Sequence, residues 1–313
     1  DNGIAYVNEN SFLTYFGFSY NLGTVYSSVV HKGNLYVATN QGVFYHPWDT
    51  DFKEGSFKLI EGTTTKAWNV QIINGELICA SNKGALLIQN RKMIKNLDPK
   101  GYFGFKSIPN HPNFFIGANY NGFSVFEKTS TGMKFRNKIE GIDKSSNSFE
   151  IDKDYLWLKK DQYIYQITLN NDLRNANTIK TFTQFSEQNP GTGSLQKIKN
   201  IVFFQSNNIF YTYSITQGTF TEDAVMTNIF KSIPKIKKLT EDNNGNLWYN
   251  FNESMGALIK EGNGKYKHVI TPFSNLTGKL VDNYMSINTI DSRNTFIGLT
   301  DGLAHYDAAV ENK

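Results

Sequence analysis

Long hydrophobic runs, paired cysteines and an apolar leader are all missing from this sequence of 313 residues. No apolar run approaches the roughly 18 residues that a membrane-spanning helix requires, so we expect a domain that is not embedded in a membrane. Cys79 is the only cysteine and stands among apolar residues, which excludes an intramolecular disulfide and indicates a buried side chain. Because the chain starts at Asp1 without a leader, we expect a mature protein or an excised soluble domain.

Blocks of like charge are absent too. The 32 lysines and arginines nearly balance the 28 acidic residues, which gives a formal net charge of +4 and argues against a nucleic-acid partner. The short run Lys235, Lys237, Lys238 is expected at a solvated strand edge or loop, with contact to a phosphate or a sugar acid as the less favoured alternative. Hydrophobic residues at 39% and aromatic residues at 14% predict a globular protein with an aromatic-rich core.

The patterns of common catalytic and metal sites are missing as well. The five histidines are scattered without a pair at metal-ligand spacing, and neither a Gly-x-Ser-x-Gly turn nor a phosphate-binding loop is present. Acidic residues such as Asp152, Glu241 and Asp291 stand where strands are expected to end in turns, not as the facing pair of a glycosidase. We therefore predict no metal, no cofactor and no enzymatic activity.

A repeated unit is the main signal that the sequence does contain. Its clearest copy runs over residues 33–45, where a turn, an apolar strand, a polar hairpin and a second strand follow one another. Six further copies begin at Gly75, Pro112, Asp154, Asn200, Gly245 and Arg293. The copies are spaced by about 43 residues on average, which is the size of a four-stranded propeller blade.

The repeat predicts an all-β fold, a seven-bladed β-propeller of four-stranded antiparallel blades that occupies residues 1–313 as a single domain. Each unit consists of short β-branched and aromatic runs separated by Asn, Gly and Asp, and lacks the apolar period of a helical solenoid. Units four and five depend on spacing and strand composition, because Gln162 and Asn208 replace the hairpin glycine. The predicted inner strands begin at residues 25, 68, 103, 148, 195, 236 and 286.

The two ends of the chain predict how the ring closes. The C-terminal unit supplies three strands, so we expect a strand near residues 11–16 to complete the last blade and to remove its exposed edge. Gly3 to Val7 duplicates a third strand that Gly302 to Tyr306 already supplies, and whether this segment belongs to the propeller is left open.

Two segments resemble the repeat of the two-component regulator propeller family. They are Glu241-Asp242-Asn243-Asn244-Gly245-Asn246-Leu247-Trp248 and Ile297-Gly298-Leu299-Thr300-Asp301-Gly302-Leu303-Ala304-His305-Tyr306-Asp307. The other five units match in part, with the tryptophan position held by Tyr36, Ile78, Phe115, Phe203 and Phe296.

The resemblance implies a periplasmic sensor domain of a hybrid histidine kinase or of a membrane-spanning transcription regulator. Many members of this family respond to glycans or their breakdown products, so the implied partner is a small-molecule or oligosaccharide ligand. The resemblance also implies that the transmembrane, kinase or DNA-binding segments lie outside this sequence and that the parent receptor can bring two copies together as a homodimer.

The ligand is expected at the face of the propeller where the inner strands begin, because the hairpins between second and third strands lie on that face too. Aromatic rings stack on sugars, and lysine or amide groups bind hydroxyls or an acidic sugar. An aromatic residue at a strand start is more often packed between blades, which applies to Trp68 and Phe103, whereas Tyr102, Tyr120 and Tyr284 have loop-forming neighbours. The predicted ligand-binding residues are Tyr26, Lys66, Trp68, Tyr102, Phe103, Tyr120, Lys235 and Tyr284.

Three functions fit a propeller of this kind. A sensor needs a pocket rimmed by aromatic and amide groups, a scaffold for protein docking or dimerisation needs an exposed apolar patch, and a glycosidase or lyase needs two close carboxylates or a metal. The sensor is favoured, the scaffold is the alternative, and the enzyme is the least favoured of the three.

Overall fold

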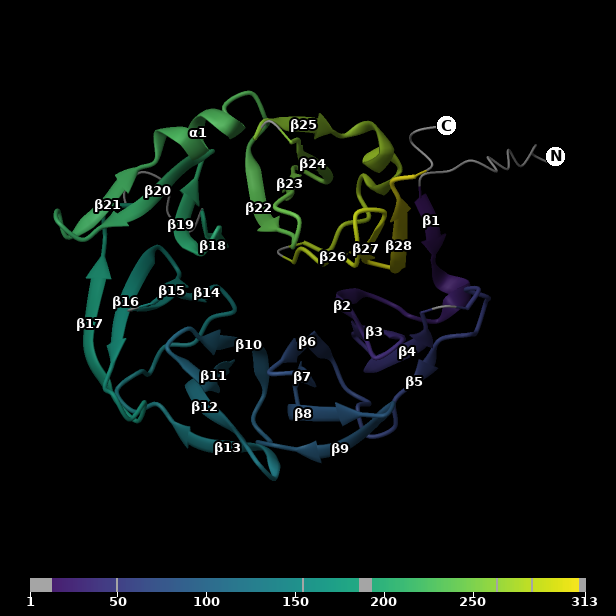
Figure 1. Cartoon of the computed structure of the whole chain (residues 1–313), viewed down its shortest axis with the longest axis horizontal. Coiled ribbons are helices and arrows are strands. Elements are labelled where there is room, and N and C mark those ends of the chain that lie inside the picture. The colour runs from purple at the N-terminus through teal and green to yellow at the C-terminus, as the bar shows by residue number, and fades with distance from the viewer. Residues whose placement is uncertain are drawn as a thin grey trace.

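The protein folds into seven four-stranded antiparallel sheets that stand as blades around a ring (Figure 1), as the sequence predicts. The computed structural model describes residues 13–48, 50–153, 155–185, 193–262, 264–282 and 284–309. The inner strands β2, β6, β10, β14, β18, β22 and β26 surround the centre, and each begins within one residue of its predicted start.

Blades 1 to 3 follow one another along the chain, and each runs from its inner strand to its outer strand. Blade 1 contains β2 (Val25–His31), β3 (Asn34–Thr39), β4 (Val43–Pro47) and β5 (Lys58–Leu59). Blade 2 contains β6 (Ala67–Ile73), β7 (Glu76–Ser81), β8 (Gly84–Gln89) and β9 (Lys92–Asn96). Blade 3 contains β10 (Tyr102–Ile108), β11 (His111–Asn119), β12 (Gly122–Thr129) and β13 (Gly132–Lys138).

Blades 4 to 6 keep the same order, including the two units that rested on spacing and strand composition. Blade 4 contains β14 (Phe149–Ile151), β15 (Leu156–Lys160), β16 (Tyr163–Leu169) and β17 (Ala176–Phe182). Blade 5 contains β18 (Ser194–Ile198), β19 (Ile201–Ser206), β20 (Ile209–Ser214) and β21 (Thr219–Glu222). Blade 6 contains β22 (Ile236–Glu241), β23 (Leu247–Phe251), β24 (Ser254–Lys260) and β25 (Tyr266–Val269).

Blade 7 combines the two ends of the chain. Its inner three strands are β26 (Ile287–Thr289), β27 (Asn294–Leu299) and β28 (Gly302–Asp307), and its outer strand is β1 (Leu13–Phe16). β1 pairs with β28 from Leu13 opposite Tyr306 to Phe16 opposite Leu303. Residues 3–7 lie outside the described part of the chain.

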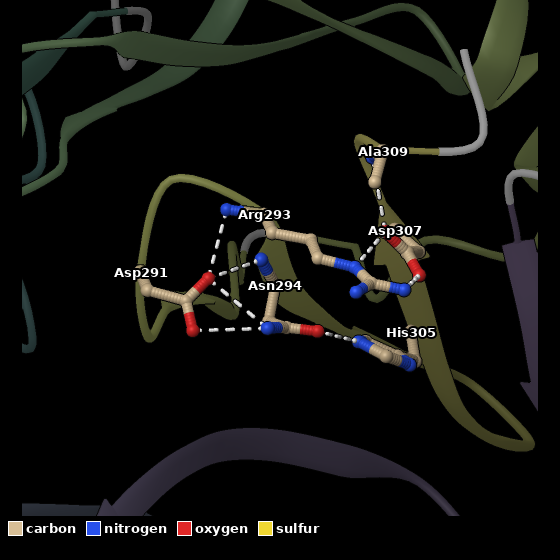
Figure 2. A network of polar contacts seen from close by, with 6 residues as sticks. All are labelled: Asp291, Arg293, Asn294, His305, Asp307 and Ala309. Atoms are coloured by element: carbon tan, nitrogen blue, oxygen red, sulfur yellow. Dashed lines mark hydrogen bonds and ion pairs between the residues drawn. The ribbon is translucent and has the colours of Figure 1, made fainter. Parts of the chain in front are cut away.

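A polar network fixes the turn between β26 and β27 and ties it to the end of β28 (Figure 2). The Asp291 carboxylate accepts hydrogen bonds from the backbone amides of Arg293 and Asn294 at 2.8 and 2.7 Å and from the Asn294 side chain. Arg293 forms a two-point ion pair with Asp307, and the Asn294 side-chain oxygen lies 2.9 Å from Nε2 of His305. These contacts hold the strands of the closing blade in register.

The hydrophobic core lies between neighbouring blades. Second and third strands such as β3, β7 and β8 are buried along nearly their whole length, because another blade covers each of their faces. This explains why they read as continuous apolar runs. At the closure, Phe16 of β1 packs in one cluster with Leu303 of β28 and with Val37 and Phe44 of blade 1, so burial of aromatic and aliphatic side chains joins the last blade to the first.

Short helices connect some of the blades. η1 (Phe18–Tyr20) follows β1, and η2 (Thr271–Leu276) follows β25. α1 (Ala224–Phe230) follows β21. The Asp223 carboxylate caps its first turn by accepting a hydrogen bond from the Met226 amide at 2.9 Å. The helix buries Met226 and Phe230 between blades 5 and 6.

Candidate functional site

Four inner strands share a β-bulge at their second residue. In β2, Val25 pairs with Thr39 and Ser27 pairs with the adjacent Ala38, so Tyr26 is left without a partner in the register. The same shift in β6, β10 and β22 leaves out Trp68, Phe103 and Lys237. A bulge re-aims the side chain that it carries, and here it presents the second residue at the mouth, the end of the central channel where the inner strands begin.

The first residue of these same strands belongs to the core, and this corrects one prediction. Tyr102 was expected to be exposed to a ligand, but it is the first residue of β10 and is 0% exposed, like Val25 and Ala67 at the equivalent positions. Its ring packs on Phe105 and Phe126, and its hydroxyl donates to the carboxylate of Asp98. Burial raises the pKa of the Tyr102 hydroxyl above its ordinary range. The loop-forming neighbour Gly101 was therefore a misleading signal.

Five aromatic residues meet at the mouth and form what we call the aromatic cluster: Tyr26, Trp68, Phe103, Tyr120 and Tyr284. Trp68 is at its centre, with its ring stacked on Tyr284 at 5.3 Å and 12°, and with Tyr26 at 5.2 Å. Phe103 lies 6.3 Å from Trp68 and 4.8 Å from Tyr120, so the contacts continue without a break across blades 7, 1, 2 and 3. Packing between blades thus places all five rings together at one end of the channel.

Hydrogen bonds from the hairpins hold Trp68 in place. Its indole N–H lies 2.8 Å from both the Asn82 side-chain oxygen and the Tyr120 hydroxyl oxygen, and the Tyr120 hydroxyl in turn donates to Asn82. Asn82 belongs to the β7–β8 hairpin and Tyr120 to the β11–β12 hairpin, which confirms that hairpins and strand starts share one face. Lys66 stands directly before β6, and its ammonium lies over the Trp68 ring, 3.8 Å from the ring centre.

Tyr284 connects the aromatic cluster to blade 4. Burial raises the pKa of its hydroxyl to about 12, while a hydrogen bond with Asn147 acts in the opposite direction. Asn147 stands just before β14, so this contact crosses the mouth. The Tyr284 hydroxyl is therefore neutral and available as a donor throughout the physiological pH range.

A cavity of about 490 Å³ extends from the aromatic cluster into the channel, and we call it the aromatic cavity. Tyr26, Trp68, Phe103 and Tyr284 line it, while Lys66 and Tyr120 adjoin it through Trp68. Polar groups line it as well. Within the described chain, the Ser28 hydroxyl, although only 8% exposed, and the Asn69 side-chain oxygen have no hydrogen-bond partner. Buried groups of this kind are suited to binding hydroxyls of a ligand.

Lys235 does not line the aromatic cavity. It lines a second cavity of about 560 Å³, formed mainly by residues of blades 4 to 6, that we call the lysine cavity. Its wall includes a lysine cluster, defined as Lys159, Lys235, Lys237 and Lys238. The two cavities share Asn147, Ser148 and Lys238, so they adjoin at one side of the mouth. The predicted ligand-binding residues include only Lys235 from the basic run, because contact of the whole run with a phosphate or a sugar acid was the less favoured alternative. The bulge in β22 falls on Lys237.

Positive charge is concentrated around Lys238. Desolvation lowers the pKa of its ammonium, and repulsion from Lys159 and Lys106 lowers it further. Lys106 is itself paired with Glu150 at 2.8 Å, and Glu150 is the only carboxylate that lines the aromatic cavity in the described part of the chain. The mouth therefore combines an aromatic side with a cationic side, and the one carboxylate that the described residues place in the aromatic cavity is already paired with a lysine.

The described residues contain no group of three or more His, Cys, Asp and Glu side chains placed to hold a metal ion. None of their helices is long and apolar enough to cross a bilayer.

Comparisons with known proteins show the fold. No protein-family model and no curated protein matches the chain. Among solved structures, virginiamycin B lyase from Staphylococcus aureus is 14% identical over 94% of this chain and 98% of its own, with a TM-score of 0.60. The extracellular domain assigned to the hybrid two-component system BT3049 from B. thetaiotaomicron is 12% identical over 96% of this chain, with a TM-score of 0.64.

The extracellular domain assigned to the system BT4673 of the same organism is 14% identical over 94% of this chain, with a TM-score of 0.57. This chain spans only 42% and 39% of the two ectodomains. The neighbours therefore show the propeller fold, which the extracellular domains of two regulators share with a lyase.

Proposed function

We propose that this chain is the ligand-sensing part of an extracytoplasmic, membrane-anchored signalling regulator, and that it binds a carbohydrate-derived ligand in the aromatic cavity. The observation that carries the proposal is the aromatic cluster, which four blades assemble around Trp68 at the mouth. Structural neighbours that are extracellular domains of hybrid two-component systems support the cellular role.

The chemistry of the cavity is suited to a sugar. Aromatic rings pack against the C–H faces of a pyranose, and neighbouring amide and hydroxyl groups bind its hydroxyls. The cavity supplies both, because Trp68 and Tyr284 line it together with Asn147. Ser28 and Asn69 line it too, and their side-chain oxygens have no hydrogen-bond partner among the described residues. A volume of about 490 Å³ is large enough for an oligosaccharide segment.

Binding rather than catalysis is favoured by the carboxylates. Hydrolysis of a glycosidic bond by the usual route requires two facing carboxyl groups. In the aromatic cavity the described residues provide only Glu150, which is engaged with Lys106 at 2.8 Å. This arrangement supports a receptor, although the lyase fold relationship makes a direct activity measurement worthwhile.

The test is titration calorimetry with a panel of neutral and acidic oligosaccharides, beginning from those that raise the melting temperature of the domain. We expect Trp68→Ala and Tyr120→Ala to weaken binding of the selected oligosaccharide by about tenfold or more, as loss of a central aromatic contact does elsewhere. Tyr120→Ala is the safer variant for folding, because Tyr120 is 41% exposed and lies in a hairpin.

The matched control is Tyr266→Ala, on the outer strand β25 of blade 6, which should leave binding unchanged. Equal affinity of the wild type, Trp68→Ala and Tyr120→Ala would place the ligand elsewhere and overturn the proposed site. Absence of binding across the panel would leave protein docking as the better explanation of the face.

A further inference from the structure

The junction between the two cavities is the basis of a more specific inference about the ligand. Lys238 lines both cavities, together with Asn147 and Ser148. A ligand that starts on the aromatic cluster and extends toward blades 4 to 6 must therefore pass this lysine. The two volumes, about 490 and 560 Å³, are each far larger than a simple anion needs, so the site is built for an extended molecule.

The charges around the two cavities are unbalanced. The residues that line them include five lysines (Lys106, Lys159, Lys235, Lys237 and Lys238) and two carboxylates (Glu150 and Asp282). Glu150 is engaged with Lys106 at 2.8 Å, and Asp282 lies 3.7 Å from Lys237 with 77% of its side chain exposed. Neither carboxylate is paired with Lys238. A cleft lined mainly by one sign of charge concentrates ligands of the opposite sign.

Lys238 itself lacks a partner. Its backbone amide donates to the Asn250 side chain at 2.6 Å, which fixes the strand position, but its ammonium makes no hydrogen bond or ion pair with any described residue. A partly buried cation without a counter-ion is unfavourable unless something else supplies the negative charge. The adjacent Gln205 oxygen, in a side chain only 1% exposed, is likewise without a donor in the described chain and lines the lysine cavity.

We propose that the ligand is an anionic oligosaccharide, with a sugar ring on the aromatic cluster and a carboxylate or sulfate group bound by Lys238 and the neighbouring Lys235 and Lys237. This inference rests on the proposed function, because it specifies the ligand class of the same site. The bulges explain why the aromatic and the cationic contacts come from different blades. They present aromatic side chains in blades 1 to 3 and Lys237, directly before Lys238, in blade 6.

The experiment compares charged and neutral forms of the same oligosaccharide backbones. The probes are uronic-acid oligosaccharides with their methyl esters, and sulfated oligosaccharides with their desulfated counterparts, titrated calorimetrically at low salt. We expect one charged series to bind at least about tenfold more tightly than its neutral form, since hydrogen bonds to ionised groups are the strong ones. The series that binds identifies the group as carboxylate or sulfate.

Variants then assign the charge to its residues. Lys238→Met should weaken the charged probe about tenfold and leave the neutral form unchanged, and it should flatten the loss of affinity that NaCl causes in the wild type. Lys235→Met, at an exposed position before β22, repeats the test where folding is not at risk and should have a smaller effect in the same direction. Lys95→Met on β9 is the control for loss of one exposed lysine.

The outcomes separate this inference from the proposed function. If neutral forms bind as tightly as charged forms, and Trp68→Ala weakens both, the carbohydrate site stands and the anionic ligand is rejected. The inference is also rejected if charged probes bind better but Lys238→Met and Lys235→Met behave like Lys95→Met. If no probe of either kind binds, both the proposed function and this inference are rejected.

Discussion

Blades 1 to 3 and blade 6 place different chemistry at the same structural position. The inner strands of these four blades have a bulge after their first residue. The bulged residue is Tyr26, Trp68 or Phe103 in the first three blades but Lys237 in the sixth. The backbone of the repeat therefore fixes where a side chain enters the mouth, whereas the individual sequence of each blade decides whether it is an aromatic ring or a cation. This division gives the mouth two unlike sides.

The far ends of the inner strands carry a third kind of chemistry. There Asp152 in blade 4 and Asp242 in blade 6 each accept a hydrogen bond from a buried indole N–H, of Trp157 and Trp248 respectively, and from amides of the turn. Asp291 holds the equivalent turn in blade 7 (Figure 2). These acids serve the fold, as expected from their turn positions, and are spatially separated from the aromatic and lysine residues of the mouth.

The largest effect on stability should come from truncating the first residue of β10, and truncation of the second residue is the comparison. Tyr102→Ala removes a fully buried ring and should lower the free energy of unfolding by about 3–5 kcal/mol, whereas Phe103→Ala, at the half-buried mouth, should lower it by about 1 kcal/mol. Denaturant unfolding of both variants measures this. Oligosaccharide affinity should respond in the opposite order, and similar stability losses would contradict the assignment of the two positions.

A smaller loss is expected at the far end of β22, in the same strand that presents Lys237 at the mouth. Asp242→Ala leaves the indole N–H of Trp248, a residue 2% exposed, without its acceptor at 2.8 Å and should lower the free energy of unfolding by about 2 kcal/mol. Affinity for the oligosaccharide should not change. Asp143→Ala, at an exposed carboxylate, is the control, and an equal effect of the two variants would show that the turn network contributes little.

The sequence was sufficient for the fold because most blades repeat the same signals and the regular spacing places the two units that lack the hairpin glycine. Turn residues, apolar second and third strands and the spacing of about 43 residues between the seven units located each inner strand to within one residue. Trp68 and Phe103 were selected as candidates because they stand at the starts of inner strands in neighbouring repeats, and the structure places both at the aromatic cavity, whereas their role in binding stays a prediction. The helix α1 was not expected, since its seven residues are too few to show a helical period among strands.

The site was only partly predictable, for two physical reasons. Whether Tyr102 or Phe103 faces the ligand depends on a bulge, which alters the alternation of a strand without leaving a mark in composition. Likewise, Lys238 meets the aromatic cavity only because the ring brings blade 6 opposite blades 2 and 3, a relationship between segments more than a hundred residues apart. Lys235, which was predicted, stands one residue before β22 and lines only the lysine cavity.

The smallest effect on stability should come from Lys238, on the cationic side of the mouth. Because the folded pKa of Lys238 is lowered, the unfolded chain binds more protons than the folded chain between that pKa and the ordinary value of 10.5. Stability from this group therefore rises with pH across that interval, and the unfavourable buried charge is fully present below it. Lys238→Met should be more stable than the wild type by about 1 kcal/mol at pH 7.

The gap between Lys238→Met and the wild type should narrow as pH rises toward 10.5, because the wild-type ammonium then loses its proton. Denaturant unfolding from pH 7 to 10 measures it, and the difference between the two proteins cancels the tyrosines that titrate in both. Lys95→Met should show no such trend. A gap that stays constant with pH would mean that the pKa of Lys238 does not change on folding, and a Lys238→Met variant less stable at pH 7 would mean that Lys238 stabilises the ligand-free fold. In either case the cationic side would not need a ligand anion to offset a buried charge.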